Sequence, residues 1–228
     1  MMIVLWLAWA AMLFGGFAFG KLNHEETHRI PTPLRMGSSA ALMIAAWVYF
    51  FTDQEALRFW LAVGMSLGFL GDLFMAGLIV KGEMRVLGGM GSFGVGHIGY
   101  IIGLLGYSSH FTGERWLALG IWWLLAVVLW YAVVYRGAKG KPSTLHYVAL
   151  PYALLLASTT GIATGLALNE GIFAVMALGT LLFLLSDLLL GAELFNGLHF
   201  KGVGDVVWLL YGPGQMLIVF TLYAAEVF

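Results

Sequence analysis

The chain has 228 residues, of which 61% are hydrophobic and only 10% are charged. A soluble domain carries roughly 45–50% apolar and about 25% charged residues, so this chain lacks the polar side chains needed to coat a globule of its size. The net charge is −1 and no basic run occurs, so nothing indicates nucleic acid as a partner. Because cysteine is absent, disulfides, thiol catalysis and cysteine-ligated metal sites are excluded.

Lipid is therefore the expected solvent for much of the surface, and a helix needs about 20 mostly apolar residues to cross it. The backbone of a spanning segment must satisfy its own hydrogen bonds, and no alternating strand pattern is visible, so the segments are predicted to be helices. Eight segments qualify: 2–19, 35–51, 57–80, 86–109, 116–135, 144–168, 171–194 and 203–226. We predict an all-α membrane protein of about eight transmembrane helices in a single domain.

The first segment has some features of a signal peptide, since Ala18-Phe19-Gly20 ends it with small residues. No positive charge precedes its apolar run, however, and Lys21 and Arg29 follow it. This order predicts a first helix that is retained in the mature protein, with its start outside the cell.

Lysine and arginine are distributed unevenly over the loops, which predicts the orientation of the chain. The even loops hold only Arg58 and Arg115. The odd loops hold Lys21, Arg29, Arg35, Lys81, Arg85, Arg136, Lys139, Lys141 and Lys201. Positive loops face the cytoplasm, so we expect cytoplasmic odd loops and external termini in a multi-pass protein of a bacterial inner membrane.

Two aspartates at matched positions suggest two half-repeats, at about 1–110 and 116–228. Asp72 lies in the third predicted span and Asp187 in the seventh. Two polar residues of the next span follow each aspartate at similar spacing, namely His97 and Tyr100 by 25 and 28 residues, and Tyr211 and Gln215 by 24 and 28. Four helices per half would give a parallel repeat, related by an axis along the membrane normal.

The two aspartates are the main candidates for chemistry, because an aspartate at a helix centre costs about 2.5–3.5 kcal/mol on insertion scales. We expect Asp72 and Asp187 to lie about two turns from the cytoplasmic ends of their helices, facing the bundle interior or a wet cavity. A neutral carboxylic acid beside an ionised carboxylate forms a general acid and base pair. The alternative is that each aspartate is only a hydrogen-bonding node between helices.

Further polar residues lie on the same helices. His97 and Tyr100 share a helix face, and His97 could pair with Asp72, bind substrate, hold a metal or simply pack. Tyr211 and Gln215 are candidates for substrate binding, with interhelical hydrogen bonding as the equal alternative.

Other side chains have simpler interpretations. Ser186 neighbours Asp187 but is not expected to form a nucleophile and base pair with it, since adjacent helical residues point apart, and no Gly-x-Ser-x-Gly elbow occurs. Aromatic-belt or packing roles are expected for Tyr147 and Tyr152. Solvated positions at the cytoplasmic rim, or a site there for a polar head group, are expected for Glu193, His199 and Asp205.

At these residues the sequence resembles a known family. The motifs are Gly71-Asp72, Phe93-x-x-x-His97-x-x-Tyr100, Phe183-x-x-Ser186-Asp187 and Tyr211-x-x-x-Gln215. In this order and spacing they resemble the YhhN family, which comprises the lysoplasmalogenases, including their mammalian transmembrane relatives. The resemblance covers nearly the whole chain. One departure is Thr32-Pro33-Leu34-Arg35, where family members often have a Thr-Lys-Pro-like sequence, so a lysine role is in doubt there.

The resemblance implies hydrolysis of the vinyl ether bond of lysoplasmalogen, a membrane lysophospholipid, without a cofactor. It implies that Asp72 and Asp187 are the catalytic pair. We expect His97, Tyr100, Tyr211, Gln215 and Ser186 to form the substrate-binding shell around them.

Three other interpretations of the sequence stay open. His97 and the two aspartates could instead hold Zn²⁺ and generate hydroxide. The chain could be a small-solute or proton-coupled transporter, because parallel repeats with charged residues inside the membrane are also found in carriers. It could also be a lipid-binding scaffold that needs neither aspartate.

Overall fold

The computed structural model describes residues 2–110, 112–138 and 141–223, and every regular element within these ranges is helical. Six elements are uninterrupted helices: α3 (Thr32–Asp53), α4 (Ala56–Met75), α5 (Glu83–Tyr107), α7 (Thr144–Ala167), α8 (Phe173–Asn196) and α9 (Val203–Val219). The first span runs through α1 (Met2–Ala10), the π-helical η1 (Ala11–Gly15) and α2 (Gly16–Phe19). The fifth runs through α6 (Gly113–Leu129), the π-helical η2 (Trp130–Tyr135) and the 3₁₀ turn η3 (Arg136–Ala138).

The predicted all-α class is therefore confirmed for the described residues. Seven of their helical segments are long and apolar enough to cross a membrane, which makes the chain a multi-pass integral membrane protein. The predicted eighth span, 203–226, is shorter in the structure, because α9 has 17 residues and ends at Val219. Residues 224–226 of that span, and Lys139 of the basic loops, lie outside the described residues.

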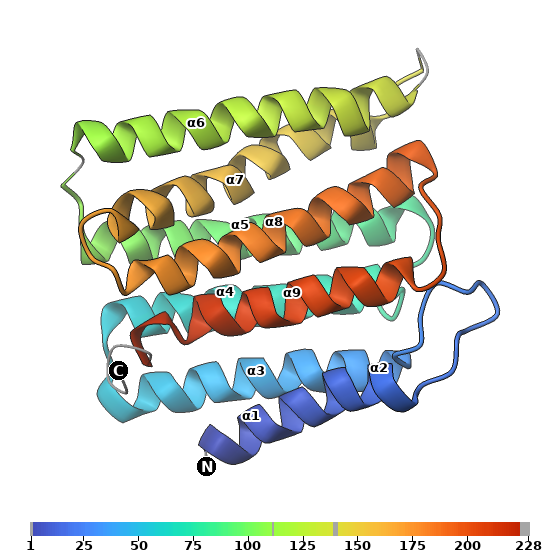
Figure 1. Cartoon of the computed structure of the whole chain (residues 1–228), viewed down its shortest axis with the longest axis horizontal. Coiled ribbons are helices and arrows are strands. Elements are labelled where there is room, and N and C mark those ends of the chain that lie inside the picture. Colours follow the sequence, from blue (N-terminus) through green and yellow to red (C-terminus); the bar gives the residue numbers. More distant parts are fainter. Residues whose placement is uncertain (1, 111, 139–140, 224–228) are drawn as a thin grey trace.

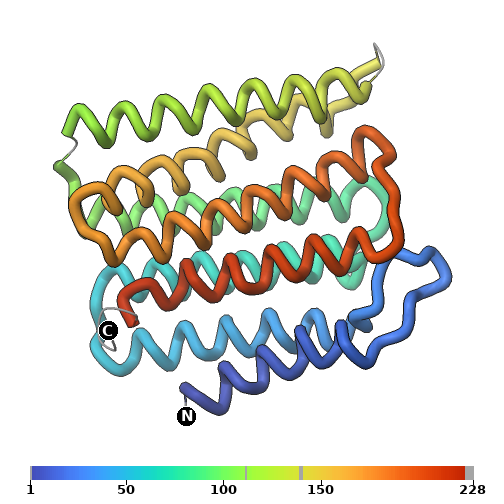
Figure 2. Tube along the Cα trace, viewed as in Figure 1, coloured from blue at the N-terminus to red at the C-terminus, as the bar shows by residue number. Residues whose placement is uncertain are grey.

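The helices form a bundle in which consecutive helices run in opposite directions (Figure 1). The central helices α4, α5, α8 and α9 are flanked by α1 and α3 on one side and by α6 and α7 on the other. The connections after α2, α4 and α8 lie at one end of the bundle, which we call the Arg35 end (Figure 2, right). The connections after α3 and α7 lie at the opposite end, which we call the Arg58 end.

Close backbone contact holds the centre of this bundle together. A Cβ atom added at Gly179 of α8 would lie 2.7 Å from the carbonyl oxygen of Gly214 in α9, and one at Gly214 would lie 2.9 Å from that of Gly179. Only glycine permits this approach. Small residues at helix crossings are the usual means of association in lipid, where no hydrophobic force drives two helices together.

The turn after α4 decides where the first aspartate lies. Gly77 has a φ of +69°, its N–H donates to the Phe74 carbonyl, and the Leu78 N–H donates to the Leu73 carbonyl. This is a Schellman motif, and it ends α4 at Met75, five residues before the predicted end of the span. The expectation that Asp72 lies two turns from the helix end is therefore wrong, since Asp72 belongs to the last turn.

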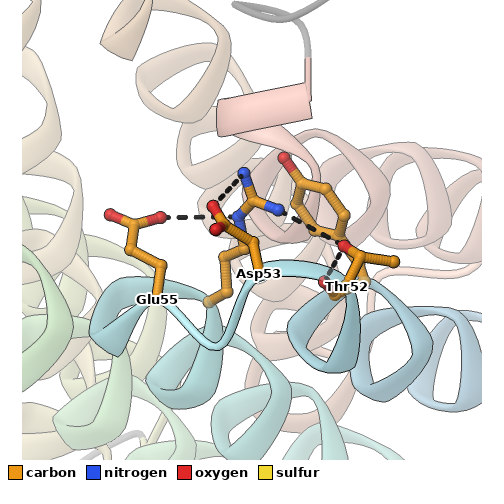
Figure 3. Close-up of polar contacts among 5 residues, drawn as sticks. Thr52, Asp53 and Glu55 are labelled. Atoms are coloured by element: carbon orange, nitrogen blue, oxygen red, sulfur yellow. Dashed lines mark hydrogen bonds and ion pairs between the residues drawn. The ribbon is translucent and has the colours of Figure 1, made fainter.

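A polar cluster closes the turn between α3 and α4 at the Arg58 end. Asp53 and Glu55 point toward one guanidinium group from either side of this turn (Figure 3). That group belongs to Arg58, whose Nη2 lies 3.2 Å from Asp53 Oδ2 and whose Nε lies 3.4 Å from Glu55 Oε2. The Tyr49 ring packs against the same guanidinium at 4.0 Å. The cluster fastens two helix ends together.

Candidate active site

Asp72 is buried at the Arg35 end of α4 and accepts two hydrogen bonds on one carboxylate oxygen. Its Oδ2 accepts from the Ser39 hydroxyl of α3 and, at 2.9 Å, from the Tyr211 hydroxyl of α9. Three helices therefore meet at this carboxylate. Its side chain is only 3% exposed, so these donors take the place of the water that an aspartate normally binds.

A string of hydrogen bonds continues from Asp72 into the bundle. The Tyr211 hydroxyl accepts from Gln215 Nε2 at 3.4 Å, and Gln215 Oε1 accepts from the Tyr100 hydroxyl at 2.8 Å. The structure thus joins Asp72, Tyr211, Gln215 and Tyr100, four of the residues that the sequence singles out. The space for them comes from α4, because a Cβ at Gly68 would lie 2.8 Å from Gln215 Nε2.

Asp187 lies on α8 and has a partner that the sequence did not reveal. It accepts a hydrogen bond from the Tyr152 hydroxyl of α7. The predicted packing role of Tyr152 is confirmed, because it packs against the buried core, but the prediction missed this hydrogen bond. Tyr152 follows Pro151 inside α7, two turns from the helix start, which is deeper than an interfacial belt. The neighbouring Ser186 is buried, and its hydroxyl has no hydrogen-bond partner among the described residues.

His97 is buried on α5, but the structure pairs it with a threonine. Its Nδ1 lies 2.9 Å from Thr159 Oγ1 of α7, and its ring packs edge-on against Tyr100 and Phe183. Its Nε2 has no hydrogen-bond partner among the described residues. Within those residues, no group of three histidine, cysteine, aspartate or glutamate side chains lies close enough together to hold a metal ion. The structure thus places Thr159 beside His97, where a zinc site would need an aspartate.

A polar cavity of about 300 Å³ opens at the Arg35 end and brings both aspartates to one space. Asp72 and Asp187 both line it, together with Ser186 and Tyr211. Its charged wall also includes Arg35 and Arg85, and the carboxylates Glu25 and Glu193. Glu193 therefore belongs to the cavity.

An apolar cavity of about 110 Å³ adjoins the polar one. It lies among α5, α6, η2, α7 and α8 and is lined almost wholly by apolar side chains such as Met90, Leu129 and Leu188. The two cavities share five wall residues, which are Met75, Phe93, Asp187, Leu190 and Leu194. Asp187 therefore lies at the junction between them, whereas Asp72 lines only the polar cavity.

The connection between α2 and α3 covers the polar cavity, and Asp205 holds it in place. The carboxylate of Asp205, in the first turn of α9, accepts from the backbone N–H groups of Arg29 at 2.7 Å and Ile30 at 3.1 Å. Asp205 is only 2% exposed, so the expectation of a solvated rim residue is wrong for it. Because Thr27 and His28 of this connection line the cavity, Asp205 positions part of its wall.

His28 and Arg35 lie side by side in one corner of this cavity. Burial and the Arg35 guanidinium lower the pKa of His28 from its usual 6.5 to about 4, against the opposing effect of Asp205. His28 is therefore neutral at pH 7 and accepts from Arg35 Nη1, whose distance to Nε2 is 3.1 Å. Arg35 Nη2 donates to Thr32 Oγ1, and its Nε is buried without a hydrogen-bond partner. No carboxylate of the described residues forms an ion pair with Arg35.

A comparison with protein families shows which family this chain belongs to. The model of the YhhN family matches residues 33–222, from the start of α3 to beyond the end of α9. This chain belongs to the YhhN family. The predicted family is therefore confirmed, and its match spans every helix that contributes to the two cavities. A comparison with curated proteins and another with solved structures each found no match.

Sequence reasoning missed several side chains of this YhhN protein. Ser39, Tyr152, Arg35 and His28 all contact an aspartate or line the polar cavity. A signal existed for Ser39, because Ser38-Ser39 is a polar pair within an apolar span. Nothing local distinguished Tyr152 from other aromatic residues, since its importance comes from a neighbour on another helix.

Proposed function

We propose that this protein hydrolyses the vinyl ether bond of a lysoplasmalogen, giving a fatty aldehyde and a glycerophospho-base. One observation carries the proposal, namely that Asp187 lies where a polar and an apolar cavity meet. A single-chain lipid has a charged head and a hydrocarbon chain, and in a lysoplasmalogen the vinyl ether group lies near the boundary between them. A lipid that fills both cavities has its reactive bond beside Asp187.

The charges of the polar cavity support a phospholipid head group. Arg35 and Arg85 provide donors for a phosphate, and guanidinium groups suit phosphate oxygens because they can donate two parallel hydrogen bonds. The carboxylates of Glu25 and Glu193, on the same wall, can accept an ammonium group. In the apolar cavity, the hydrocarbon chain can pack against apolar side chains as it does in lipid.

Two carboxyl groups on one cavity provide what vinyl ether hydrolysis requires. The reaction begins with proton transfer to the carbon on the chain side, which leaves an oxocarbenium ion at the carbon bonded to oxygen. Water then adds, and the hemiacetal collapses to an aldehyde and an alcohol. An acid, a negative charge beside the cation and a base for water are needed, and Asp72 and Asp187 can supply all three. Membership of the YhhN family, which includes the lysoplasmalogenases, supports the same reaction.

The test is aldehyde release by purified protein in detergent, where transport has no meaning. We expect Asp72→Asn and Asp187→Asn each to lose at least about a hundredfold in turnover, the usual range for a general acid or base. Asp53→Asn is the matched control, because Asp53 lies at the Arg58 end, far along α3 from the cavity. It should retain turnover.

Two outcomes would contradict the proposal. One is near-normal turnover by a folded aspartate variant. The other is release of fatty acid from an ester lysophospholipid with no cleavage of the vinyl ether, which would indicate an esterase.

A further inference from the structure

The two aspartates differ in their hydrogen-bond donors. Asp72 Oδ2 accepts from two hydroxyl groups, Ser39 and Tyr211, whereas Asp187 accepts from one, Tyr152. Both hydroxyl groups donate to the same oxygen of Asp72. Hydrogen bonds donated to a carboxylate stabilise its charged form, and two donors do so more than one. The hydrogen bonding around Asp72 therefore suits a carboxylate ion better than a carboxylic acid.

The string of hydrogen bonds that extends from Asp72 into the bundle also favours a charged Asp72. Gln215 uses its Oε1 to accept from Tyr100 and its Nε2 to donate to the Tyr211 oxygen. With its oxygen occupied in this way, Tyr211 directs its one proton to Asp72. Each donor in the string thus points toward the carboxylate, and the dipoles add up at that oxygen.

The two aspartates also differ in position. Asp187 lines both cavities, and Asp72 lines only the polar one. In a vinyl ether, the carbon that receives the proton is on the chain side, and the carbon that becomes cationic is bonded to the oxygen on the head side. A chain in the apolar cavity thus brings the first carbon to Asp187 and leaves the second on the side of Asp72.

We propose that Asp187 is the proton donor and that Asp72 remains ionised as the cation stabiliser and base; this assignment rests on the proposed function. The Asp187 O–H bond breaks as the π electrons of the double bond form a C–H bond, and positive charge develops beside Asp72. Water adds to the cationic carbon and passes a proton to Asp72. When the hemiacetal collapses, Asp72 returns that proton to the leaving glycerol oxygen, and Asp187 takes the hydroxyl proton. Both groups regain their starting states.

The assignment gives roles to the neighbouring hydroxyl groups. Ser39 and Tyr211 are positioning residues that hold the negative charge on Asp72. Tyr152 is a positioning residue that orients the Asp187 carboxyl toward the junction of the cavities. Loss of the Ser39 or Tyr211 hydroxyl should weaken the binding of a cation. Loss of the Tyr152 hydroxyl should slow proton transfer and leave the binding of a cation unchanged.

The experiment measures binding of two stable analogues by proteins in detergent. One is a saturated alkyl lysophospholipid with a secondary ammonium in place of the ether oxygen, which shares the positive charge of the oxocarbenium ion, and the other is the neutral saturated ether of the same length. We expect wild type and Asp187→Asn to bind the ammonium analogue at least about tenfold more tightly than the ether, since asparagine resembles a neutral aspartic acid. Asp72→Asn should lose that preference.

A second pair of variants covers the case in which Asp72→Asn does not fold. Tyr211→Phe should reduce the preference for the ammonium analogue, and Tyr152→Phe should keep it while aldehyde release falls. The assignment is overturned if Asp187→Asn loses the preference and Asp72→Asn keeps it, or if all variants match wild type. If wild type releases no aldehyde, the proposed function fails, and the ratio of the two dissociation constants still decides which aspartate carries the charge.

Discussion

Arg35 and Arg58 lie at opposite ends of the bundle, near the starts of α3 and α4, and they have contrasting partners. Arg58 is 6% exposed and forms ion pairs with Asp53 and Glu55. Arg35 hydrogen-bonds to a neutral histidine and a threonine and lines a cavity of about 300 Å³. A guanidinium paired with carboxylates stabilises a turn. One that forms no ion pair among the described residues and lines a polar cavity is available, under the proposed function, to a phosphate group.

The sharpest test of this difference is a reciprocal pair of variants. We expect Arg35→Gln to lower kcat/KM for lysoplasmalogen by at least about a hundredfold, close to 3 kcal/mol, because a charged phosphate contact is lost. Its unfolding temperature should stay close to that of wild type. Arg58→Gln should do the opposite, lowering the free energy of unfolding by about 1–3 kcal/mol while the folded fraction keeps its turnover. Aldehyde release and thermal unfolding in the same detergent measure the turnover and the stability of each variant. Equal losses of activity in the two variants would show that Arg35 and Arg58 do not differ in role.

Asp205 offers the next test, because it attaches the connection 20–31 to the Arg35 end. Asp205→Asn removes a charged acceptor from two backbone donors, that of Ile30 buried and that of Arg29 partly buried, at a cost of about 1–3 kcal/mol. We expect faster amide hydrogen exchange at Arg29 and Ile30, and a fall in turnover of about tenfold, because His28 and Thr27 lose their positions on the cavity wall. Unchanged exchange at both amides would show that other contacts hold the connection.

The inner part of the site can be tested through a glycine. Gly68→Ala adds a Cβ that would lie 2.8 Å from Gln215 Nε2, and such overpacking costs about 1–3 kcal/mol. Displacement of Gln215 should also disturb Tyr211 and slow turnover. Gly91→Ala is the control, since nothing lies within 4 Å of its Cβ, and alanine should stabilise α5 slightly. If both variants unfold alike, the string of hydrogen bonds does not depend on this contact.

The same residues show what the sequence could predict. Composition and apolar runs gave the class and nearly every helix, because lipid leaves the backbone few alternatives. The cost of burying an aspartate pointed to Asp72 and Asp187, and the matched spacing of polar residues in the next span added Tyr100, Tyr211 and Gln215. The positions of the cavities could not be read, since they depend on how seven or more helices pack. The proposed parallel repeat stays a prediction.

For the same reason, the sequence did not reveal hydrogen-bond partners that lie on different segments of the chain. Asp205 follows Gly202-Val203-Gly204 and looks like an ordinary first-turn acid, yet its acceptors face a connection 175 residues earlier. The Schellman turn at Gly77 shortened α4 by one turn, although the glycine that causes it is visible in the sequence. Local signals set helix ends within a few residues, and that margin decided how deep Asp72 lies.

The smallest effect is expected from an exposed ion pair of the connection 20–31. Lys201 Nζ lies 3.1 Å from Glu26 Oε1, but the side chains are 71% and 48% exposed. Exposed pairs contribute at most about 1 kcal/mol, because water screens both charges and two long side chains lose freedom. Lys201→Gln should therefore leave turnover, unfolding temperature and exchange at Arg29 within error of wild type. A loss as large as that of Asp205→Asn would mean that surface charge, rather than the buried carboxylate, holds the cavity wall in place.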